Sequence, residues 1–411
     1  MNILIIILYL TLFVVSLRNV RFAIMIFIAH LPIVPLIHAN GTIPLNDFFS
    51  IIVFYHLFFS KKIVVRASLD KNVAKGLSVF LVVTAIVSYI NDIKFIIMHD
   101  GILTSVPSHI LDAVITSITV VNILHLLSKS MWNVEIRRNI YRGFLISSFI
   151  LSISLFYSEE LYLLGFKISE EVAFSERPSG LFADGDCNGL AGFLCLSIAI
   201  ILWYNKLVKN SISKTVMFIV MLNSSAVLYT QSRMGFLCLI SLIVYYVFIL
   251  QDIRKSIPSL FYMVIGCIIL LVFTDVFTGV LERLQGANVR NEVNGEEGRS
   301  LIWGMYLDYM FNSSQWNILW GADKMIFDIV PHNYYIYSFF VSGILFAILL
   351  ILCQIYASMK CSLVMGHKII LPLNLLTIIP LLFLTDSTII FYYVLSVGLI
   401  ASIVYSGKNA Y

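Results

Sequence analysis

Charged residues are scarce in this chain. Only 12% of its 411 residues are Asp, Glu, Lys or Arg, whereas soluble domains carry about 25%. Hydrophobic residues reach 60% and the mean hydropathy is +0.94. Apolar runs close to the ~20 residues needed to cross a bilayer recur along the whole sequence. The scarcity of charge excludes a soluble globular protein and predicts an all-α polytopic membrane protein.

Cysteine and nucleotide-binding motifs are sparse as well. The six cysteines fall mostly within apolar runs and show no metal-ligand spacing, so we expect neither a disulfide framework nor a metal site. No Gly-x-x-x-x-Gly-Lys-Ser/Thr motif occurs, which argues against the use of ATP or nucleotide sugars from the cytoplasm. No basic region precedes the first apolar run, and the first arginine is Arg18. We therefore expect a retained first helix and not a cleaved signal peptide.

The apolar runs predict one integral membrane domain over 1–411 with about 12–13 transmembrane helices. The expected helices cover 2–17, 20–38, 46–60, 74–90, 106–128, 140–157, 187–204, 214–230, 233–250, 256–274, 334–357, 369–385 and 388–406. The last two are alternatively one broken pair around residues 385–387.

The distribution of basic residues predicts the orientation of these helices. Most of the 27 Lys and Arg residues lie in alternate connectors, which marks those connectors as cytoplasmic. The N-terminus then lies outside and the C-terminus inside. Two long loops face outward, over 158–186 and 274–333, and the second is expected to contain short amphipathic helices. A loop this long is more often functional than a plain connector.

Three arginines on the expected outer side are candidates for binding phosphate. Arg233 lies between two apolar runs, where a guanidinium normally has a partner or an aqueous cavity. It can grip phosphate oxygens with two parallel hydrogen bonds, or it can be an anchor at the lipid headgroups. Arg177 lies in a Pro- and Gly-containing turn, and Arg299 precedes an apolar segment that can lie along the membrane surface. For Arg177 a plain solvated loop is the alternative.

The end of the second outer loop supplies a candidate base. His332 follows Pro331 and begins an apolar helix, which places its imidazole at the outer membrane boundary. Imidazole is the side chain that accepts a proton near neutral pH without a large pKa shift. Asn333 can bind a hydroxyl or carbonyl group but cannot act as a base. Asp386, at a later outward turn, can orient a histidine or simply cap the turn. The alternative for His332 is a helix cap or interfacial anchor.

Together these pieces carry a resemblance to a known family. They are Arg177-Pro-Ser-Gly-Leu-Phe with Asn188, Thr230-Gln-Ser-Arg233, Gly298-Arg299 leading to Trp303, and Pro331-His332-Asn333 followed by Gly343. In order and spacing they resemble the O-antigen ligase/polymerase superfamily over roughly 177–346. The chain departs from the ligase pattern in two places: Phe346 stands at its last position, and Tyr334 stands where many ligases have a carboxylate. These departures favour a polymerase over a ligase.

The resemblance implies a metal-independent glycosyltransferase in the bacterial cytoplasmic membrane, without a cofactor, whose site faces the periplasm or exterior. The donor would be a glycan on polyprenyl pyrophosphate, and the acceptor a second lipid-linked repeat unit or, in a ligase, lipid A-core. His332 would serve as base, Arg233 and Arg299 would stabilise the leaving group, and Arg177, Asn333, Tyr334 and Asp386 would bind substrate. Implied partners are membrane lipids and the chain-length regulator and flippase of the same pathway, with no nucleic acid.

Two alternatives belong to other classes. A flippase or exporter of lipid-linked sugars also needs an arginine-lined cavity, but it would place charges deep within several spans. Here the charges cluster at the outer ends of the expected helices, which favours an enzyme. A non-catalytic membrane partner in glycan export would tolerate the loss of His332.

Overall fold

The computed structural model describes most of the chain as helices. It covers residues 3–33, 38–39, 43–44, 46–59, 69–98, 106–128, 133–164, 166, 168, 173–174, 178–182, 185–209, 213–245, 299–322, 326–327, 331–383 and 388–408. Before the second predicted outer loop the helices are α1 (Ile3–Arg18), α2 (Val20–His30), α3 (Asn46–Phe58), α4 (Lys71–Met98), α5 (Val106–Leu127), α6 (Val134–Phe156), α7 (Ser158–Leu163), α9 (Cys187–Tyr204) with the π-helical turn η1 (Asn205–Lys209), α10 (Lys214–Tyr229) and α11 (Arg233–Tyr245). The later ones are α14 (Arg299–Asn312), α15 (Gln315–Trp320), α16 (Tyr334–Met365), α17 (His367–Phe383) and α18 (Thr388–Lys408).

The helices confirm the prediction of a helical membrane protein. Five of them, within the described residues, contain stretches long and apolar enough to cross a membrane, by length and composition: Lys71–Ile90, Val134–Phe156, Cys187–Val208, Tyr334–Met365 and Ile389–Ser406. The described strands are β1 (His38–Ala39) and β2 (Ile43–Pro44), which form a two-residue antiparallel pair.

Several predicted boundaries differ from the structure. Helix α4 covers Lys71–Met98 where 74–90 was expected, and α6 begins at Val134 where 140 was expected. The helix expected over 20–38 ends at His30, with Leu31 as a C-cap that still has helical backbone, because Pro32 lacks the backbone N–H that would continue the hydrogen-bond ladder. The helix expected over 334–357 runs to Met365, but it is broken at Gly343, whose φ is +82°. The predicted span 256–274 and the loop up to residue 298 lie outside the described residues.

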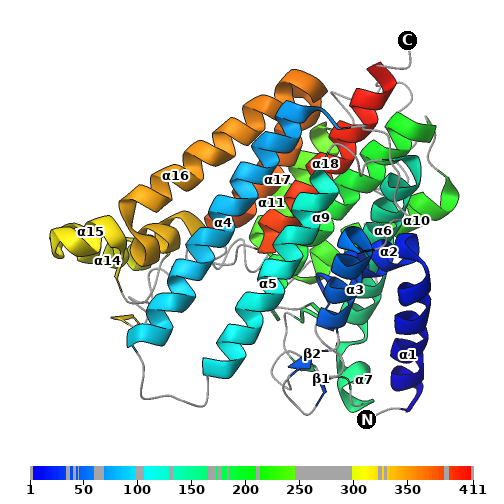
Figure 1. Cartoon of the computed structure of the whole chain (residues 1–411), viewed down its shortest axis with the longest axis horizontal. Helices are drawn as coiled ribbons and strands as arrows, with labels where there is room; N and C mark the ends of the chain where they lie inside the picture. The colour runs from blue at the N-terminus through cyan, green and yellow to red at the C-terminus, as the bar shows by residue number, and fades with distance from the viewer. Residues whose placement is uncertain are drawn as a thin grey trace.

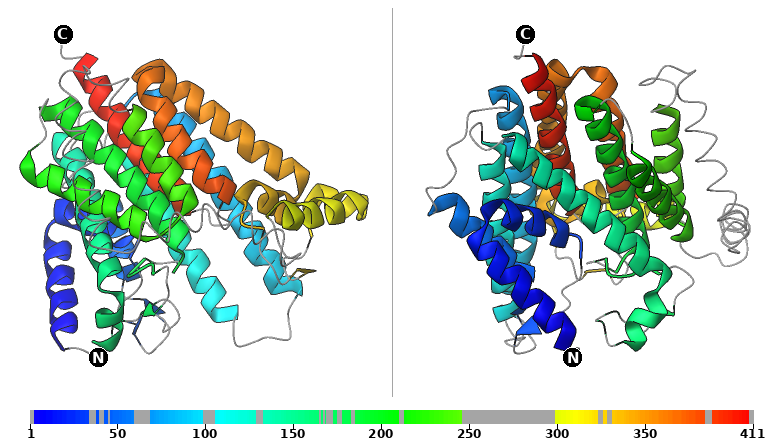
Figure 2. Two further views of the ribbon diagram at one scale, coloured as in Figure 1. Left: turned by 180° about the vertical axis from the view of Figure 1, so that it is seen from behind. Right: turned by 90° about the vertical axis from the view of Figure 1, so that its right-hand side faces the viewer.

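Helix α9 forms the centre of the bundle. It packs against α6, α10, α11, α17 and α18, and almost all its side chains are buried. Small residues allow this close packing. A methyl group added at Gly235 of α11 would lie 2.6 Å from the Ala191 Cβ atom. Figures 1 and 2 show α9 surrounded by other helices, with α14 and α15 projecting from the bundle at the end where α16 breaks.

Candidate functional site

The connection between α10 and α11 is a tight turn with an unusual backbone. Gln231 has φ +51°, a left-handed conformation that non-glycine residues adopt rarely. The Ser232 amide donates to the Thr230 hydroxyl over 3.3 Å, and the Ser232 Oγ accepts from the Gly235 amide over 3.1 Å. These bonds close the turn and cap the start of α11.

A side chain from α9 fastens this turn to the bundle. The Ser232 Oγ donates to the Asn188 Oδ1 over 2.8 Å. Asn188 is in turn held by Asp186, whose Oδ1 accepts from the Asn188 backbone amide over 2.8 Å and from its Nδ2 over 3.2 Å. The turn is therefore fixed to the start of α9 by Asn188, which lies 44 positions before Ser232 in the sequence.

Arg233 follows this turn directly. It is the first residue of α11, and its side chain is exposed while both neighbours, Ser232 and Met234, are buried. The positive end of a helix dipole adds to the guanidinium charge at such a position. An anion that approaches the start of α11 would meet both.

The second turn, at Pro331–Asn333, repeats this feature. His332 has φ +45°, so among the described residues Gln231 and His332 are the two non-glycine residues with positive φ. The His332 side chain is exposed between buried Pro331 and Asn333. The Asn333 Oδ1 accepts from the backbone amides of Tyr335 and Ile336, both over 3.1 Å. Asn333 is thus the buried N-cap of α16.

Helix α14 holds this turn from outside. The Trp303 Nε1 donates to the Pro331 carbonyl oxygen over 2.7 Å. The backbone of Arg299 lies one helical turn before Trp303, at the start of α14, and its side chain lies outside the described part of the structure. Tyr306, one turn after Trp303, packs on Phe340 of α16 with ring centroids 4.6 Å apart. Burial and the neighbouring Tyr337 raise the pKa of Tyr306 to about 12, so its hydroxyl stays protonated near neutral pH.

Two glycines lock α15 onto the break in α16. At Gly343 an added Cβ would lie 2.1 Å from the Leu319 carbonyl oxygen, and at Gly321 it would lie 2.2 Å from the Val341 carbonyl oxygen. Both glycines have φ above +80°. A side chain at either position would therefore combine backbone strain with a collision against main-chain atoms. Only glycine therefore fits at position 343, which gives a physical reason for the glycine that follows His332 in the sequence pattern.

Helix α17 lies next to both turns. It packs against α11 and against α16. A methyl group added at Gly192 of α9 would lie 3.3 Å from the Pro380 Cγ atom and 3.6 Å from the Met234 Cε atom. Two residues earlier on α17, Ile378 lines a pocket together with Tyr335. The second half of α17 is therefore near Met234, the residue after Arg233, and shares a pocket with Tyr335, three residues after His332.

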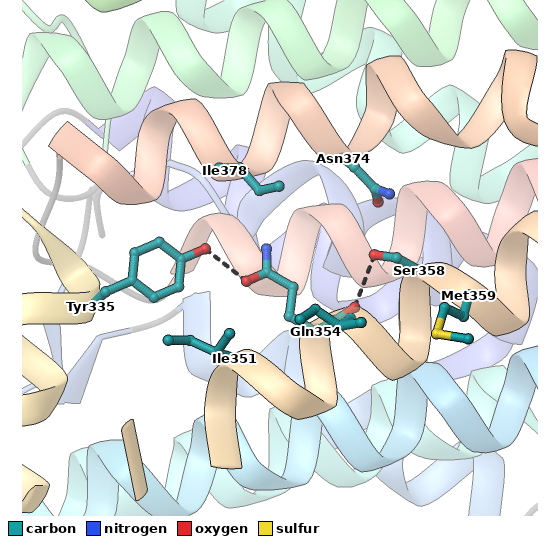
Figure 3. A pocket seen from close by; sticks show the side chains of 8 residues that line it. Tyr335, Ile351, Gln354, Ser358, Met359, Asn374 and Ile378 are labelled. Carbon is teal, nitrogen blue, oxygen red and sulfur yellow. Dashed lines mark hydrogen bonds between the residues drawn. The ribbon is translucent and has the colours of Figure 1, made fainter. Parts of the chain in front are cut away.

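The pocket between α16 and α17 has a volume of about 420 Å³. The Tyr335 hydroxyl donates to the Gln354 Oε1 over 2.7 Å across the break at Gly343, and the Tyr393 hydroxyl donates to the Asn374 Oδ1. Figure 3 shows the side chains of Gln354 and Asn374 on facing helices of this pocket. The bond from Tyr335 to Gln354 holds the first part of α16, and so the His332 turn, against the membrane-crossing part, while the bond from Tyr393 to Asn374 joins α18 to α17.

The remaining predicted site residues lie in less accessible or undescribed places. Tyr334 is 3% exposed and belongs to the core, which leaves little ring area for stacking on a sugar. Arg177 and Asp386 lie outside the described residues. The neighbouring segment 178–182 is buried, and the Leu181 amide donates to the Ser154 Oγ of α6 over 3.0 Å.

The structure thus places His332 and Asn333 in one turn at the start of α16 and Arg233 at the start of α11, and both helices pack against α17. The roles of Ser232 and Gln354 were missed from the sequence, because single polar residues in apolar runs do not reveal their partners. Among the residues that the structure describes, no group of three or more His, Cys, Asp or Glu side chains is arranged to hold a metal ion. No protein-family model and no curated protein matches this chain.

Proposed function

We propose that this protein is a membrane-embedded glycosyltransferase that polymerises lipid-linked oligosaccharide repeat units on the outer face of the bacterial cytoplasmic membrane. The observation that carries the proposal is the pair of left-handed turns at Gln231 and His332. Backbone strain of this kind costs about 1–3 kcal/mol per residue and clusters at functional sites. Here it occurs beside an exposed arginine and at an exposed histidine, on helices that flank the end of α17.

The arrangement suits transfer of a glycan from polyprenyl pyrophosphate. The acceptor hydroxyl oxygen forms a bond to the anomeric carbon of the donor, and the bond from that carbon to the pyrophosphate oxygen breaks. His332 accepts the hydroxyl proton as general base. Arg233 stabilises the negative charge that develops on the leaving pyrophosphate, as positioned donors do. In this proposal Arg299, at the start of α14, serves the same leaving group.

A ligase that transfers the glycan to lipid A-core is the second candidate. The spacing from His332 to Gly343 favours it, because this spacing resembles the ligase pattern. Phe346 and Tyr334 depart from that pattern and favour the polymerase. Both reactions use the same donor and the same His and Arg roles, so they differ only in the acceptor.

Glycan analysis after deletion of the gene separates the two reactions. We expect single repeat units attached to the surface anchor, which indicates the loss of a polymerase. Full-length polymer stranded on the lipid carrier would indicate a ligase instead. Normal surface glycan in the deletion strain would contradict both.

The proposed orientation has its own test. Cysteines introduced at Ser169 or Asn294 should react in whole cells with a membrane-impermeant thiol reagent, provided that the outer envelope is permeable to it. Lys71→Cys, at the start of α4, should not react, because basic connectors are expected in the cytoplasm. The reverse labelling pattern would overturn the topology and with it the outer-face site.

A further inference from the structure

Helices α14 and α15 expose several large apolar side chains. Leu301, Met305, Phe311, Trp316, Leu319 and Trp320 are each between 41% and 68% exposed; we call this set the hairpin face. On α15, Trp316, Leu319 and Trp320 have the i, i+3, i+4 spacing that puts them on one side of the helix. The rings of Trp316 and Trp320 lie 5.8 Å apart between centroids. An apolar surface of this kind normally marks an interaction site.

The opposite side of α14 is already covered. Ile302, Tyr306 and Met310 are buried against Phe340 and Val341 of α16. The contacts with α16 leave the hairpin face exposed. Asp308 is also exposed and lies among these apolar side chains, three residues from both Met305 and Phe311, so the face is apolar with one carboxylate, which suits the boundary between lipid and water better than the hydrocarbon core.

The position of α15 indicates what covers the hairpin face. Its end packs on the backbone at Gly343, where the long part of α16 begins. At about 1.5 Å per residue, the stretch from 344 to 365 is about 33 Å long, which matches the ~30 Å hydrocarbon core of a bilayer. Gly343 therefore lies at one boundary of the bilayer, and α15 lies at the same level.

The exposed side chains of α16 that follow Gly343 also indicate that α15 lies at the boundary of the bilayer. Leu345, Ile348 and Leu352, which follow Gly343 on α16, are exposed as lipid-facing residues of a membrane helix are. Tryptophan is enriched at the boundary between lipid and water, because its ring is apolar and its N–H is polar. The hairpin face thus continues an apolar membrane surface at the depth where tryptophans gather. Figure 1 shows α14 and α15 beside this end of α16.

We propose that the hairpin face is a lipid-contact surface, which inserts into the headgroup region of the bilayer and anchors α14 and α15 there. Through the bond from Trp303 to the Pro331 carbonyl, the anchor would also hold the His332 turn at a set depth. The proposal does not depend on the proposed glycosyl transfer.

Tryptophan fluorescence of the full chain in nanodiscs tests this proposal. One copy is placed in each disc, so that a second copy cannot cover the surface, and the phosphatidylcholine carries bromine at a shallow or a deep position of its acyl chains. The emission of Trp316 and Trp320 is the difference between the natural chain and the W316F/W320F variant. These conservative changes on an exposed surface should leave the fold intact. We expect shallow bromine to quench this difference emission more than deep bromine does, and aqueous iodide to quench it little.

Two results would overturn the proposal. Emission quenched by iodide and unaffected by brominated lipid would show that the hairpin face lies in water. Emission insensitive to both quenchers would show that protein covers the two rings. Trp203→Phe is the matched control, since Trp203 is 1% exposed in the core and its loss should leave the lipid-quenched difference emission unchanged.

Discussion

The two left-handed turns are built alike but anchored differently. The Gln231 turn is fastened to the centre of the bundle, through the hydrogen bond from Ser232 to Asn188 on α9. The His332 turn is held within the bundle by buried Tyr334 and by the bond from Tyr335 to Gln354. It is held in addition from outside, through Trp303 of α14 and through the close contact of α15 with Gly343. The arginine candidate is therefore anchored to the central helix, while the histidine candidate depends in part on helices at the periphery. Changes in α14 and α15 should affect the histidine side of the site alone.

Substitution of Gly343, which joins α15 to the His332 side of the site, should have the largest effect on the protein's stability. Gly343→Ala adds positive-φ backbone strain of roughly 1–3 kcal/mol and a collision with the Leu319 carbonyl oxygen. We expect a large loss of thermal stability and of folded protein in detergent, measured by an unfolding assay.

Two other glycines serve as matched controls for that substitution. Gly366 has φ +80° with no atom within 4 Å of an added Cβ, so Gly366→Ala should cost only the backbone strain of roughly 1–3 kcal/mol. Gly304 lies within α14 with open space around it, and Gly304→Ala should stabilise by about 0.5–1 kcal/mol. Equal effects at the three positions would show that the α15–α16 contact is unimportant.

The second largest effect is expected from substitution of His332, which should lower the transfer activity and leave the stability unchanged. His332→Asn is the sharpest variant, because asparagine tolerates a left-handed backbone and keeps hydrogen bonding but does not accept a proton near neutral pH. General-base catalysis contributes about 10²–10⁴-fold, so visible polymer should disappear at unchanged expression. Full polymer from this variant would restrict His332 to a positioning role.

A smaller loss is expected for Arg233→Lys. Lysine keeps the charge but lacks the planar fork that binds two phosphate oxygens, so transfer should fall strongly while the protein remains in the membrane. Arg21→Lys is the control, because Arg21 forms a surface ion pair with Glu135 and such pairs contribute about 0–1 kcal/mol. Near-normal polymer from Arg233→Lys would mean that only a diffuse positive charge is required.

The smallest effect is expected from loss of the hydrogen bond between Ser232 and Asn188, which anchors the Gln231 turn. Asn188→Ala and Ser232→Ala should each cost about 1 kcal/mol of stability, and the double variant should cost less than their sum because both remove one shared bond. Each variant should also lower transfer without affecting the His332 turn. Ser241→Ala, further along α11, is the control. Additive losses would indicate that the two side chains act independently.

The sequence alone determined the class of the protein and the position of most helices. Scarce charge and long apolar runs leave helices as the structure that satisfies the backbone in a bilayer, and α9 spans the predicted 187–204. It also pointed to Arg233 and His332, because a charged or titratable group at the end of an apolar run is costly unless it is used. The sequence misplaced several helix ends, since α2 ends early before Pro32 and both α4 and α6 begin earlier than hydropathy indicates. It also missed the break at Gly343 within α16, where hydropathy is continuous.

Only the tertiary structure decided how the turns are held and which side chains they leave accessible. Sequence distance gives no sign that Ser232 meets Asn188, that Trp303 meets Pro331, or that Tyr335 reaches Gln354 across the break in α16. The tertiary structure also shows that Asn333 caps a helix and that Tyr334 is buried, whereas the sequence predicts that both bind substrate. The physical reason is that apolar residues satisfy burial and lipid contact equally well. Hydropathy therefore predicts that a segment is a helix, whereas the packing of small and polar side chains between helices decides which face it buries.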